Sequence, residues 1–219
     1  VLHLSFSGCP PALYFDTEKL GCSDWIGQSL EYLKAEQSIK NVLVGFRYSS
    51  FLFGGQTNDY PNLPNETPTM EYTELAKKDG KVANPREVYW DSLSAIIEQL
   101  LSAGKQVYLL YPIPELPAHI NKLATPFSIF NKEPLVNLQE TTSHNYYSER
   151  NAYILEKLDS LPQHANLIAI KPFDALCSSN HCPAAIDGLA LYFDDNHLSL
   201  IGAKRLLEID LARTIAVHL

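Results

Sequence analysis

Short runs of hydrophobic residues recur along the chain and alternate with longer amphipathic stretches. Four runs have the length of a strand and carry apolar residues at successive positions: 1–6 (VLHLSF), 41–46 (NVLVGF), 106–112 (QVYLLYP) and 166–172 (NLIAIKP). Such runs are typical of strands that lie between two layers of helices. The pattern therefore predicts a parallel sheet.

The stretches between these runs have the spacing of amphipathic helices. One of them opens on Pro85, which suits the first turn of a helix, and closes before Gly104. Helices are predicted over residues 24–37, 85–103, 146–161 and 199–218. A strand followed by a helix, four times over, predicts an α/β fold in a single domain over residues 1–219: a three-layer sandwich with a doubly wound, mainly parallel sheet.

Two segments interrupt the alternation of strand and helix. Residues 52–84, rich in Gly, Pro, Asn and Thr, follow the second hydrophobic run, and residues 113–144 follow the third. Both are expected to be long ordered loops. In open α/β sheets ligands bind beyond the carboxyl ends of the strands, and long loops within compact domains are usually functional. We therefore expect the binding site at this edge of the sheet.

Composition and charge exclude several classes of partner. A chain of 219 residues with 46% hydrophobic residues is long enough to fold alone as a monomer, without a metal ion. The net charge of −8 has the wrong sign for a protein that binds nucleic acid or an anionic lipid surface. Every apolar run falls far short of the roughly 20 residues that a membrane-spanning helix needs. Since the sequence opens on Val1 inside a predicted strand, we expect it to be part of a longer protein.

The four cysteines form two pairs that are close in sequence, Cys9 with Cys22 and Cys177 with Cys182. An even number in two local pairs favours disulfides and an oxidising compartment. Zinc is an alternative because His181 adjoins Cys182, but neither pair has the two-residue spacing of a zinc knuckle. Free thiols are the third possibility. The remaining histidines show no metal-ligand spacing, so we expect no metal site.

The sharpest candidate for chemistry is the segment YFDDNHLSLIGA at residues 192–203. In it, Asp194 and His197 stand three residues apart, ahead of the last predicted helix. A carboxylate that accepts a hydrogen bond from the imidazole Nδ1 leaves Nε2 free to take a proton from a nucleophile. The alternative is that Asp195 and Ser199 cap the helix while His197 packs or faces solvent.

This segment resembles the C-terminal block of the SGNH (GDSL-like) hydrolases, in which D-x-x-H precedes the last helix. The string DDNHLSLIGA, with DGLALYF and the Cys177–Cys182 loop before it, is similar to the SGNH domains fused to bacterial membrane acyltransferases that O-acylate cell-surface glycans. SGCPP at residues 7–11 resembles the cysteine-containing turn of those domains, which implies that Cys22 is the disulfide partner of Cys9. The resemblance implies an SGNH/flavodoxin-like fold.

The first of two departures from the family concerns the nucleophile, and the second concerns the oxyanion-binding block. The sequence contains no Gly-Asp-Ser, the family's nucleophile motif. We therefore expect the family's first strand, nucleophile turn and first helix to lie upstream of Val1. Ser5 and Ser7 are the nearest serines, but the resemblance aligns both with the family's second strand, so they are poor substitutes. GGQTND at residues 54–59 looks like the family's G-x-N-D block, but its position in a loop makes this a coincidence.

The resemblance also points to residues that contact the substrate. VLVGFRYSSF at residues 43–52 is similar to a strand that ends in an Arg-aromatic pair, so Arg47 and Tyr48 stand where ordinary SGNH hydrolases have an oxyanion-binding Asn. A guanidinium can donate to an oxyanion or to a substrate carbonyl, and a salt bridge is the alternative. Arg150, in the stretch YYSERN, matches an arginine of the fused domains, and its alternative is a solvated or ion-paired side chain.

Four loop tyrosines are candidates for stacking on sugar rings, with packing in the core as the alternative: Tyr60, Tyr72, Tyr146 and Tyr147.

The resemblance implies a function for the chain. It implies a periplasmic or extracellular domain, tethered through a membrane acyltransferase domain that presents the acyl donor. The domain would transfer an acyl group, expected to be acetyl, to a surface polysaccharide by a Ser-His-Asp mechanism without a cofactor, with Asp194 and His197 as two members of the triad. An O-acetylesterase of the same family, or a glycan-binding or scaffold module without catalysis, are the alternatives.

Overall fold

The computed structural model describes residues 1–6, 8–16, 21–52, 60–63, 71–72, 77–78, 81–82, 84–124 and 137–218. Within these ranges, the side chains of 71–72, 77–78, 81–82 and 210–218 are not described. Ser7, the GGQTND motif at 54–59 and the side chain of Tyr72 thus lie outside the described residues. The chain forms two compact units, one of residues 1–56, 65–110 and 153–169, the other of residues 57–64, 111–152 and 170–219.

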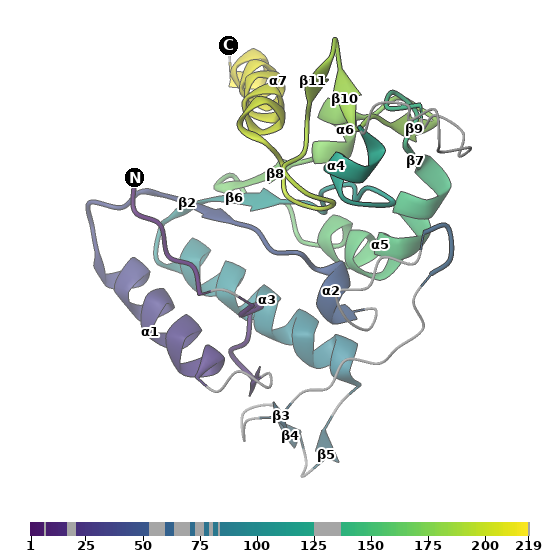
Figure 1. The fold of residues 1–219 in the computed structure, drawn as a ribbon. Coiled ribbons are helices and arrows are strands. Elements are labelled where there is room, and N and C mark those ends of the chain that lie inside the picture. Colours follow the sequence, from purple (N-terminus) through teal and green to yellow (C-terminus); the bar gives the residue numbers. More distant parts are fainter. Residues whose placement is uncertain are drawn as a thin grey trace. The chain divides into compact units, whose positions relative to one another are not determined.

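A three-stranded sheet lies at the centre of the first unit (Figure 1). Its strands are β2 (Asn41–Val44), β6 (Gln106–Leu110) and β8 (Leu167–Ile170), in the order β2-β6-β8. β2 and β6 run parallel, with Val42 opposite Val107. β8 adds to β6 through the N–H of Val107, which donates to the carbonyl of Asn166 over 2.7 Å. The predicted α/β fold with a parallel sheet flanked by helices is confirmed.

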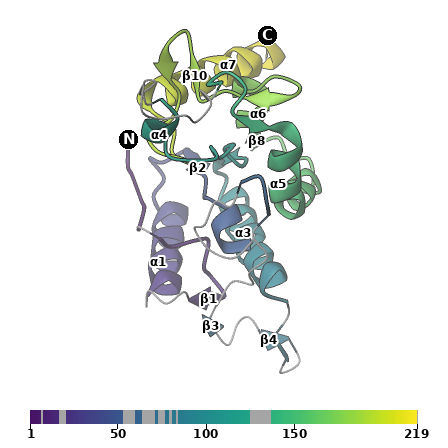
Figure 2. The ribbon, with the colours of Figure 1, turned by 45° about the vertical axis from the view of Figure 1, so that its right-hand side comes forward.

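Two long helices pack beside this sheet, α1 (Cys22–Ala35) and α3 (Pro85–Ser102), and Figures 1 and 2 show them side by side. α3 begins where the sequence predicts it, because the side chain of Asn84 accepts from the N–H of Arg86 over 2.9 Å and Pro85 occupies the first turn. The apolar face of α3 is buried, as are the inward residues of β6: Val88, Leu93, Ile97, Leu100, Val107 and Leu109. The short helix α2 (Ser49–Leu52) follows β2.

The predicted strand at residues 1–6 is wrong. These residues form no strand, and the side chain of Leu2 is 53% exposed. The segment is held instead against helix α1, because the ring of Phe6 lies 5.9 Å from that of Trp25 and Cys9 is bonded to Cys22. Phe6 therefore packs against a helix here rather than a neighbouring strand, while Val1 and Leu2 are exposed.

The other strands are shorter and less buried than predicted. β6 and β8 end before Pro112 and Pro172, which have no N–H to continue a ladder. Leu43, in the middle of β2, is 61% exposed, so this strand is not buried on both faces. The four helices agree with their predicted bounds to within about two residues at each end.

The second unit is built from short elements around a small core. Its helices are α4 (Ile120–Leu123), the first half of α5 (His144–Asp159), α6 (Pro172–Leu176) and α7 (Leu200–His218), and its strands are β7 (Thr142–Ser143), β9 (His181–Cys182), β10 (Ala185–Ile186) and β11 (Leu189–Ala190). The segment expected to be a loop, 113–144, thus contains α4 and β7, and α5 begins at its last residue. One core cluster consists of Leu116, Ile120, Ala184, Leu191 and Tyr192.

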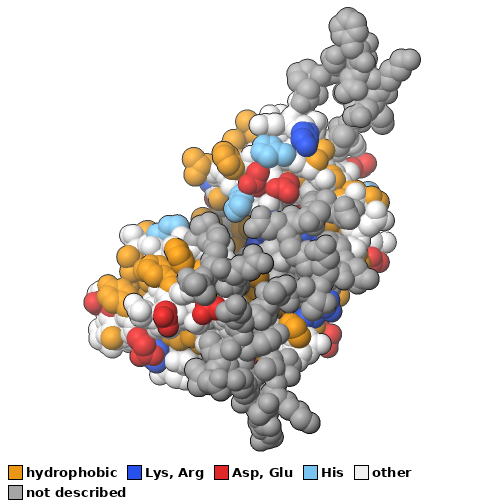
Figure 3. All heavy atoms as spheres, turned by 60° about the horizontal axis from the view of Figure 1, so that its bottom comes forward, with side chains coloured by type: hydrophobic (Ala, Val, Ile, Leu, Met, Phe, Trp, Pro, Cys, Tyr) orange, Lys and Arg blue, Asp and Glu red, His pale blue; other side chains and the backbone are white. Residues whose placement is uncertain are grey.

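The segment expected to be a loop at 52–84 is described only in part. Its described pieces include β3 (Glu71–Tyr72), which pairs with β1 (Phe15–Asp16), and a two-stranded ladder of β4 (Lys77–Lys78) and β5 (Lys81–Val82). No helix in the described part of the chain has the length and hydropathy to cross a membrane. On the face drawn in Figure 3, the described Lys and Arg side chains are scattered rather than gathered into a patch.

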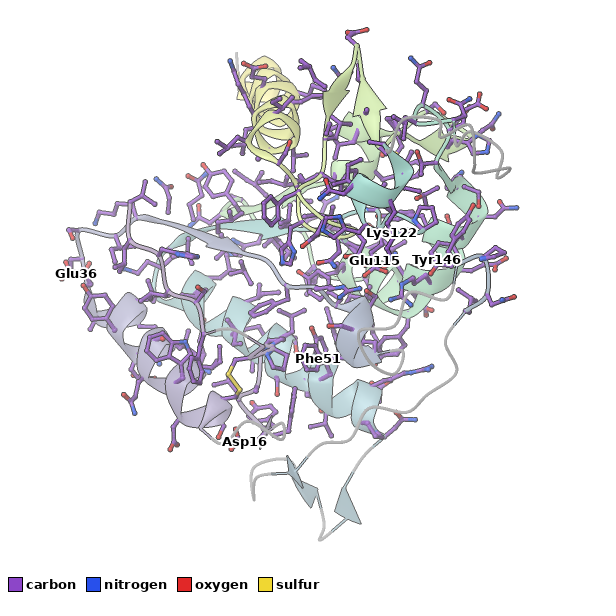
Figure 4. All side chains as sticks on the ribbon, in the orientation of Figure 1. Asp16, Glu36, Phe51, Glu115, Lys122 and Tyr146 are labelled. Carbon is purple, nitrogen blue, oxygen red and sulfur yellow. A yellow bond between two sulfur atoms is a disulfide. The ribbon has the colours of Figure 1, made fainter. Side chains whose placement is uncertain are left out.

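All four cysteines are in disulfides, Cys9–Cys22 and Cys177–Cys182, which confirms the predicted pairing. The yellow bond near Asp16 in Figure 4 is the first of them. A disulfide stabilises mainly by restricting the unfolded chain, and more so for a longer loop.

The two bridges are expected to differ in how much they stabilise the protein. Their sequence separations are 13 and 5 residues. We expect the double substitution Cys9→Ala/Cys22→Ala to lower the free energy of unfolding by about 3 kcal/mol, and Cys177→Ala/Cys182→Ala by about 2 kcal/mol. Urea unfolding of both variants measures which loses more free energy of unfolding. An equal loss, or a larger loss from removing the bridge with the shorter loop, would show that packing rather than loop closure dominates.

Candidate active site

Asp194 and His197 form a hydrogen-bonded pair in the loop that precedes helix α7. The Nδ1 atom of His197 lies 2.7 Å from Oδ2 of Asp194. An ionised carboxylate only accepts hydrogen bonds, so in the neutral form of the ring Nδ1 carries the proton and Nε2 holds a lone pair. The imidazole is 72% exposed, and Nε2 has no hydrogen-bond partner among the described residues. The loop therefore presents a proton acceptor to solvent.

The second oxygen of Asp194 fixes the shape of the loop. Oδ1 accepts from the backbone N–H of Asn196 over 2.8 Å and from that of His197 over 2.7 Å. Partial burial raises the pKa of the Asp194 carboxyl, but these two hydrogen bonds and the contact with the His197 ring lower it by more. The pKa is therefore lower than usual, and the carboxylate is ionised at neutral pH.

A hairpin and a helix cap hold the ends of this loop. Strands β10 and β11 are joined by Asp187 and Gly188, both with positive φ, which is the geometry of a two-residue Asp-Gly turn. After β11, the carbonyl of Leu191 accepts from the N–H of Ser199 over 2.9 Å. The hydroxyl of Ser199 accepts from the N–H of Gly202 over 3.1 Å. The expected cap by Ser199 and the Asp194–His197 pair thus exist together, whereas the side chain of Asp195 accepts from the side-chain amide of Asn196 over 2.7 Å.

Gly202 allows helix α7 to start close to the preceding strand. A Cβ atom at this position would lie 2.1 Å from the carbonyl oxygen of Leu191. That oxygen belongs to the backbone and cannot rotate away, so the close approach requires glycine. The same carbonyl closes the loop at Ser199, which makes Gly202 part of the support for the dyad.

The segment after strand β6 supports the other side of the loop. The N–H of Leu116 donates to the carbonyl of Asp195 over 2.7 Å, and the N–H of Ile120 to that of Asp194 over 3.2 Å. Both donors belong to the buried core cluster of the second unit. The backbone of the dyad is therefore tied to a rigid part of that unit.

Arg47 and Tyr48 lie in the first unit, directly after strand β2. The hydroxyl of Tyr48 is buried and donates to the carbonyl of Leu110 over 2.7 Å, so this side chain ties β2 to β6. Arg47 is half-buried, and its carbonyl accepts from the hydroxyl of Ser50 over 2.8 Å. Binding of an oxyanion or substrate by these two residues stays a prediction.

Arg150 lies on helix α5 and is only 1% exposed. Its Nε donates to Oε2 of Glu115, which is also buried. Two alternatives to substrate binding were considered for Arg150, a solvated and an ion-paired side chain. The structure shows the ion-paired one.

The tyrosines proposed for sugar stacking are mostly in the core. Tyr146 and Tyr147 are buried, and the hydroxyl of Tyr147 donates to the carbonyl of Pro112 over 3.2 Å. The ring of Tyr60 packs edge-on against that of Tyr146, at 4.7 Å between centroids. Packing thus accounts for these three rings. No group of three or more metal-ligating side chains occurs among the described residues.

The lowered pKa of Asp194 predicts a pH dependence of stability. A carboxyl whose pKa is lowered on folding stabilises the protein above its ordinary pKa, and this stabilisation is lost as the pH falls through the lowered value. We expect the wild type to be more stable than Asp194→Asn at pH 6, and the difference to shrink toward pH 3. Urea unfolding at both pH values measures it. A difference of the same size at pH 6 and pH 3 would show that the charge of Asp194 does not stabilise the fold.

The chain combines a parallel α/β sheet with an aspartate–histidine dyad just before the last helix. This combination defines a class of α/β proteins in which the dyad can act as an acid–base pair toward a nucleophile. The family description "SGNH domain (fused to AT3 domains)" matches residues 1–209. The chain belongs to this family.

A solved structure shares the fold. The periplasmic domain of a lipopolysaccharide acetyltransferase from Salmonella ser. Paratyphi A superposes with a TM-score of 0.59 and 16% sequence identity. The match covers 95% of this chain and 69% of that one. A search of curated proteins found no match.

Three residues that support the site were missed by reasoning from the sequence. Glu115 and Leu116 lie in a segment expected to be a loop, and Gly202 lies inside a predicted helix. The signal for Glu115 was a single charge within the apolar stretch LLYPIPELP. The signal for Gly202 was a glycine in the first turn of a helix, where it lowers helix propensity without an evident reason.

Proposed function

We propose that the chain is the extracytoplasmic SGNH-type domain of an O-acyltransferase that transfers an acyl group, most simply acetyl, to a cell-surface polysaccharide. The observation that carries the proposal is the 2.7 Å contact between Asp194 and His197, with Nε2 open to solvent. Membership of a family fused to AT3 domains supports it. So does the likeness to a domain described as part of a lipopolysaccharide acetyltransferase.

The proposed reaction has two steps that share one base. A serine outside these 219 residues attacks the acyl ester, and its proton passes to Nε2 of His197 as the bond from serine to the acyl carbon forms. The bond to the leaving alcohol breaks, and that alcohol takes the proton from His197. A sugar hydroxyl then attacks the acyl-serine, gives its proton to His197, and releases the serine, which recovers the proton.

The other groups have supporting roles in this proposal. Asp194 holds the His197 ring in the required tautomer and stabilises the imidazolium that forms in each step. Backbone N–H groups, and Arg47 as the proposed side-chain donor, stabilise the oxyanion of the tetrahedral intermediate. No step requires a cofactor.

The proposed location is the periplasm or cell exterior, with tethering through a membrane acyltransferase domain that presents the acyl donor. The two disulfides support an oxidising compartment. The fusion to AT3 domains that describes the family supports the tether and the membrane partner.

A test of the acceptor separates transfer from hydrolysis. The domain with its native flanking residues is incubated with an acetyl ester, with and without de-acetylated surface polysaccharide from the same organism. We expect acetylated polysaccharide, detected by mass spectrometry, and a faster release of the leaving alcohol when the acceptor is present. Release of acetate alone would identify an esterase. Binding of the polysaccharide without turnover would identify a glycan-binding module.

A further inference from the structure

The second unit contains a buried ion pair that the proposed reaction does not use. Arg150 and Glu115 are 1% and 5% exposed, and Nε of the arginine donates to Oε2 of the glutamate. The Nη1 and Nη2 atoms of Arg150 are buried and have no hydrogen-bond partner among the described residues. Glu115 is therefore the group that compensates this buried charge, and without it the guanidinium would be strongly unfavourable.

Glu115 is connected to the dyad loop through its own backbone. Figure 4 labels it in the interior of the second unit. Its carbonyl accepts from the hydroxyl of Thr142 over 2.7 Å, which ties the segment to strand β7. The next residue, Leu116, donates to the carbonyl of Asp195. The ion pair and the hydrogen bond that holds the loop between Asp194 and His197 thus come from adjacent residues, Glu115 and Leu116.

Tyr192 gives a second connection between the ion pair and the loop. It is 2% exposed, belongs to the same core cluster as Leu116, and precedes Asp194 by two residues. Burial raises the pKa of its hydroxyl, and the nearby charge of Glu115 adds to this effect. Leu116, the residue next to Glu115, and Tyr192, at the start of the dyad loop, therefore belong to one buried cluster.

We propose that the Arg150–Glu115 ion pair positions the Asp194–His197 dyad. Arg150 fixes the carboxylate of Glu115, and Glu115 fixes the segment whose N–H groups hold the backbone of the loop. Both are positioning residues, since neither is exposed enough to contact a substrate. The inference deepens the proposed function and rests on it for activity, but the geometry it concerns can be measured without turnover.

The test replaces the ion pair by apolar side chains of similar size. A buried ion pair can often be replaced in this way with little loss of stability, whereas removal of one partner is strongly destabilising. We therefore expect Glu115→Gln to lower the Tm by several degrees. The double variant Arg150→Met/Glu115→Leu is expected to unfold near the wild-type Tm.

The readout is the tautomer of His197, obtained from the ¹⁵N chemical shifts of its ring in alkaline solution. In the wild type we expect the proton mainly on Nδ1, because Asp194 accepts it. In the folded double variant we expect the population to move toward the Nε2–H form, which free imidazole prefers in water. An unchanged tautomer in that variant would overturn the proposal and leave the pair a purely stabilising one.

A second variant covers the case in which the double variant does not fold. Arg150→Lys keeps the positive charge but loses the planar guanidinium that fixes the carboxylate. It is expected to show the same change of tautomer to a smaller extent, and a wild-type tautomer would again overturn the proposal.

The matched control is an ion pair in the first unit. Lys157 and Glu87 lie 3.0 Å apart and are partly exposed. Lys157→Met/Glu87→Leu removes a pair of the same charges and is expected to leave the ring shifts of His197 unchanged. If the wild type lacks turnover but the tautomer responds as expected, the proposed function fails and the positioning role stands. If turnover is present and the tautomer does not respond, the proposed function stands and the positioning role fails.

Discussion

Replacing His197 by alanine is expected to lower the turnover of acetyl esters by at least about a thousandfold, since loss of the base removes proton transfer from both steps. The free energy of unfolding should change little, because the His197 side chain is 72% exposed and its ring bonds to Asp194 near the surface. The measurement is hydrolysis of p-nitrophenyl acetate by the domain with its native flanking residues, together with urea unfolding of the same preparation.

The matched control for His197→Ala is His3→Ala. His3 is also an exposed histidine, and it lies in the N-terminal segment of the first unit. Its removal should leave both turnover and stability at the wild-type value. If His197→Ala unfolds the protein instead, His197 is a structural residue. If it folds and turns over normally, another group is the base.

The largest loss of stability is expected from Gly202→Ala. The new Cβ would lie 2.1 Å from the backbone oxygen of Leu191, so the first turn of helix α7 and the end of the hairpin must separate. We expect a loss of about 4 kcal/mol, more than ordinary overpacking, because a backbone carbonyl cannot rotate away as a side chain does. The same separation breaks the hydrogen bond from Ser199 to Leu191 and should also abolish turnover.

Gly27→Ala is the matched control, since it makes the same substitution inside helix α1. A Cβ at Gly27 has no atom within 4 Å. Alanine there is expected to stabilise the protein by about 0.5–1 kcal/mol through helix propensity and the unfolded state. Equal effects of the two substitutions in urea unfolding would show that the contact with Leu191 is not what determines stability at Gly202.

The fold class was predictable because periodicity is a local property of the sequence. The helices could be placed from Pro85 and Gly104 and from the spacing of apolar residues, and the strands from their hydrophobic runs. Residues 1–6 were predicted wrongly because an apolar run does not say whether it packs on a strand or on a helix. In this chain the disulfide from Cys9 to Cys22 and the ring of Trp25 hold the segment against helix α1.

The dyad was predictable for a similar reason. Asp194 and His197 are three residues apart, so their contact is local; the D-x-x-H spacing allows it, and the resemblance to SGNH hydrolases favoured it over a simple helix cap. The Glu115–Arg150 pair joins residues 35 positions apart, and no local pattern indicates which charges meet across such a distance. The same limit applies to Gly202, whose need for glycine comes from the carbonyl of Leu191 rather than from its own helix.

The measurement that we would make first is intact mass analysis after incubation of the domain, with its native flanking residues, with p-nitrophenyl acetate. The proposed mechanism predicts an increase of about 42 Da, one acetyl group, that maps to a serine and is absent from His197→Ala. An unmodified protein without turnover would contradict acyl transfer at this site, and Asp194 and His197 would then serve only to shape the start of helix α7.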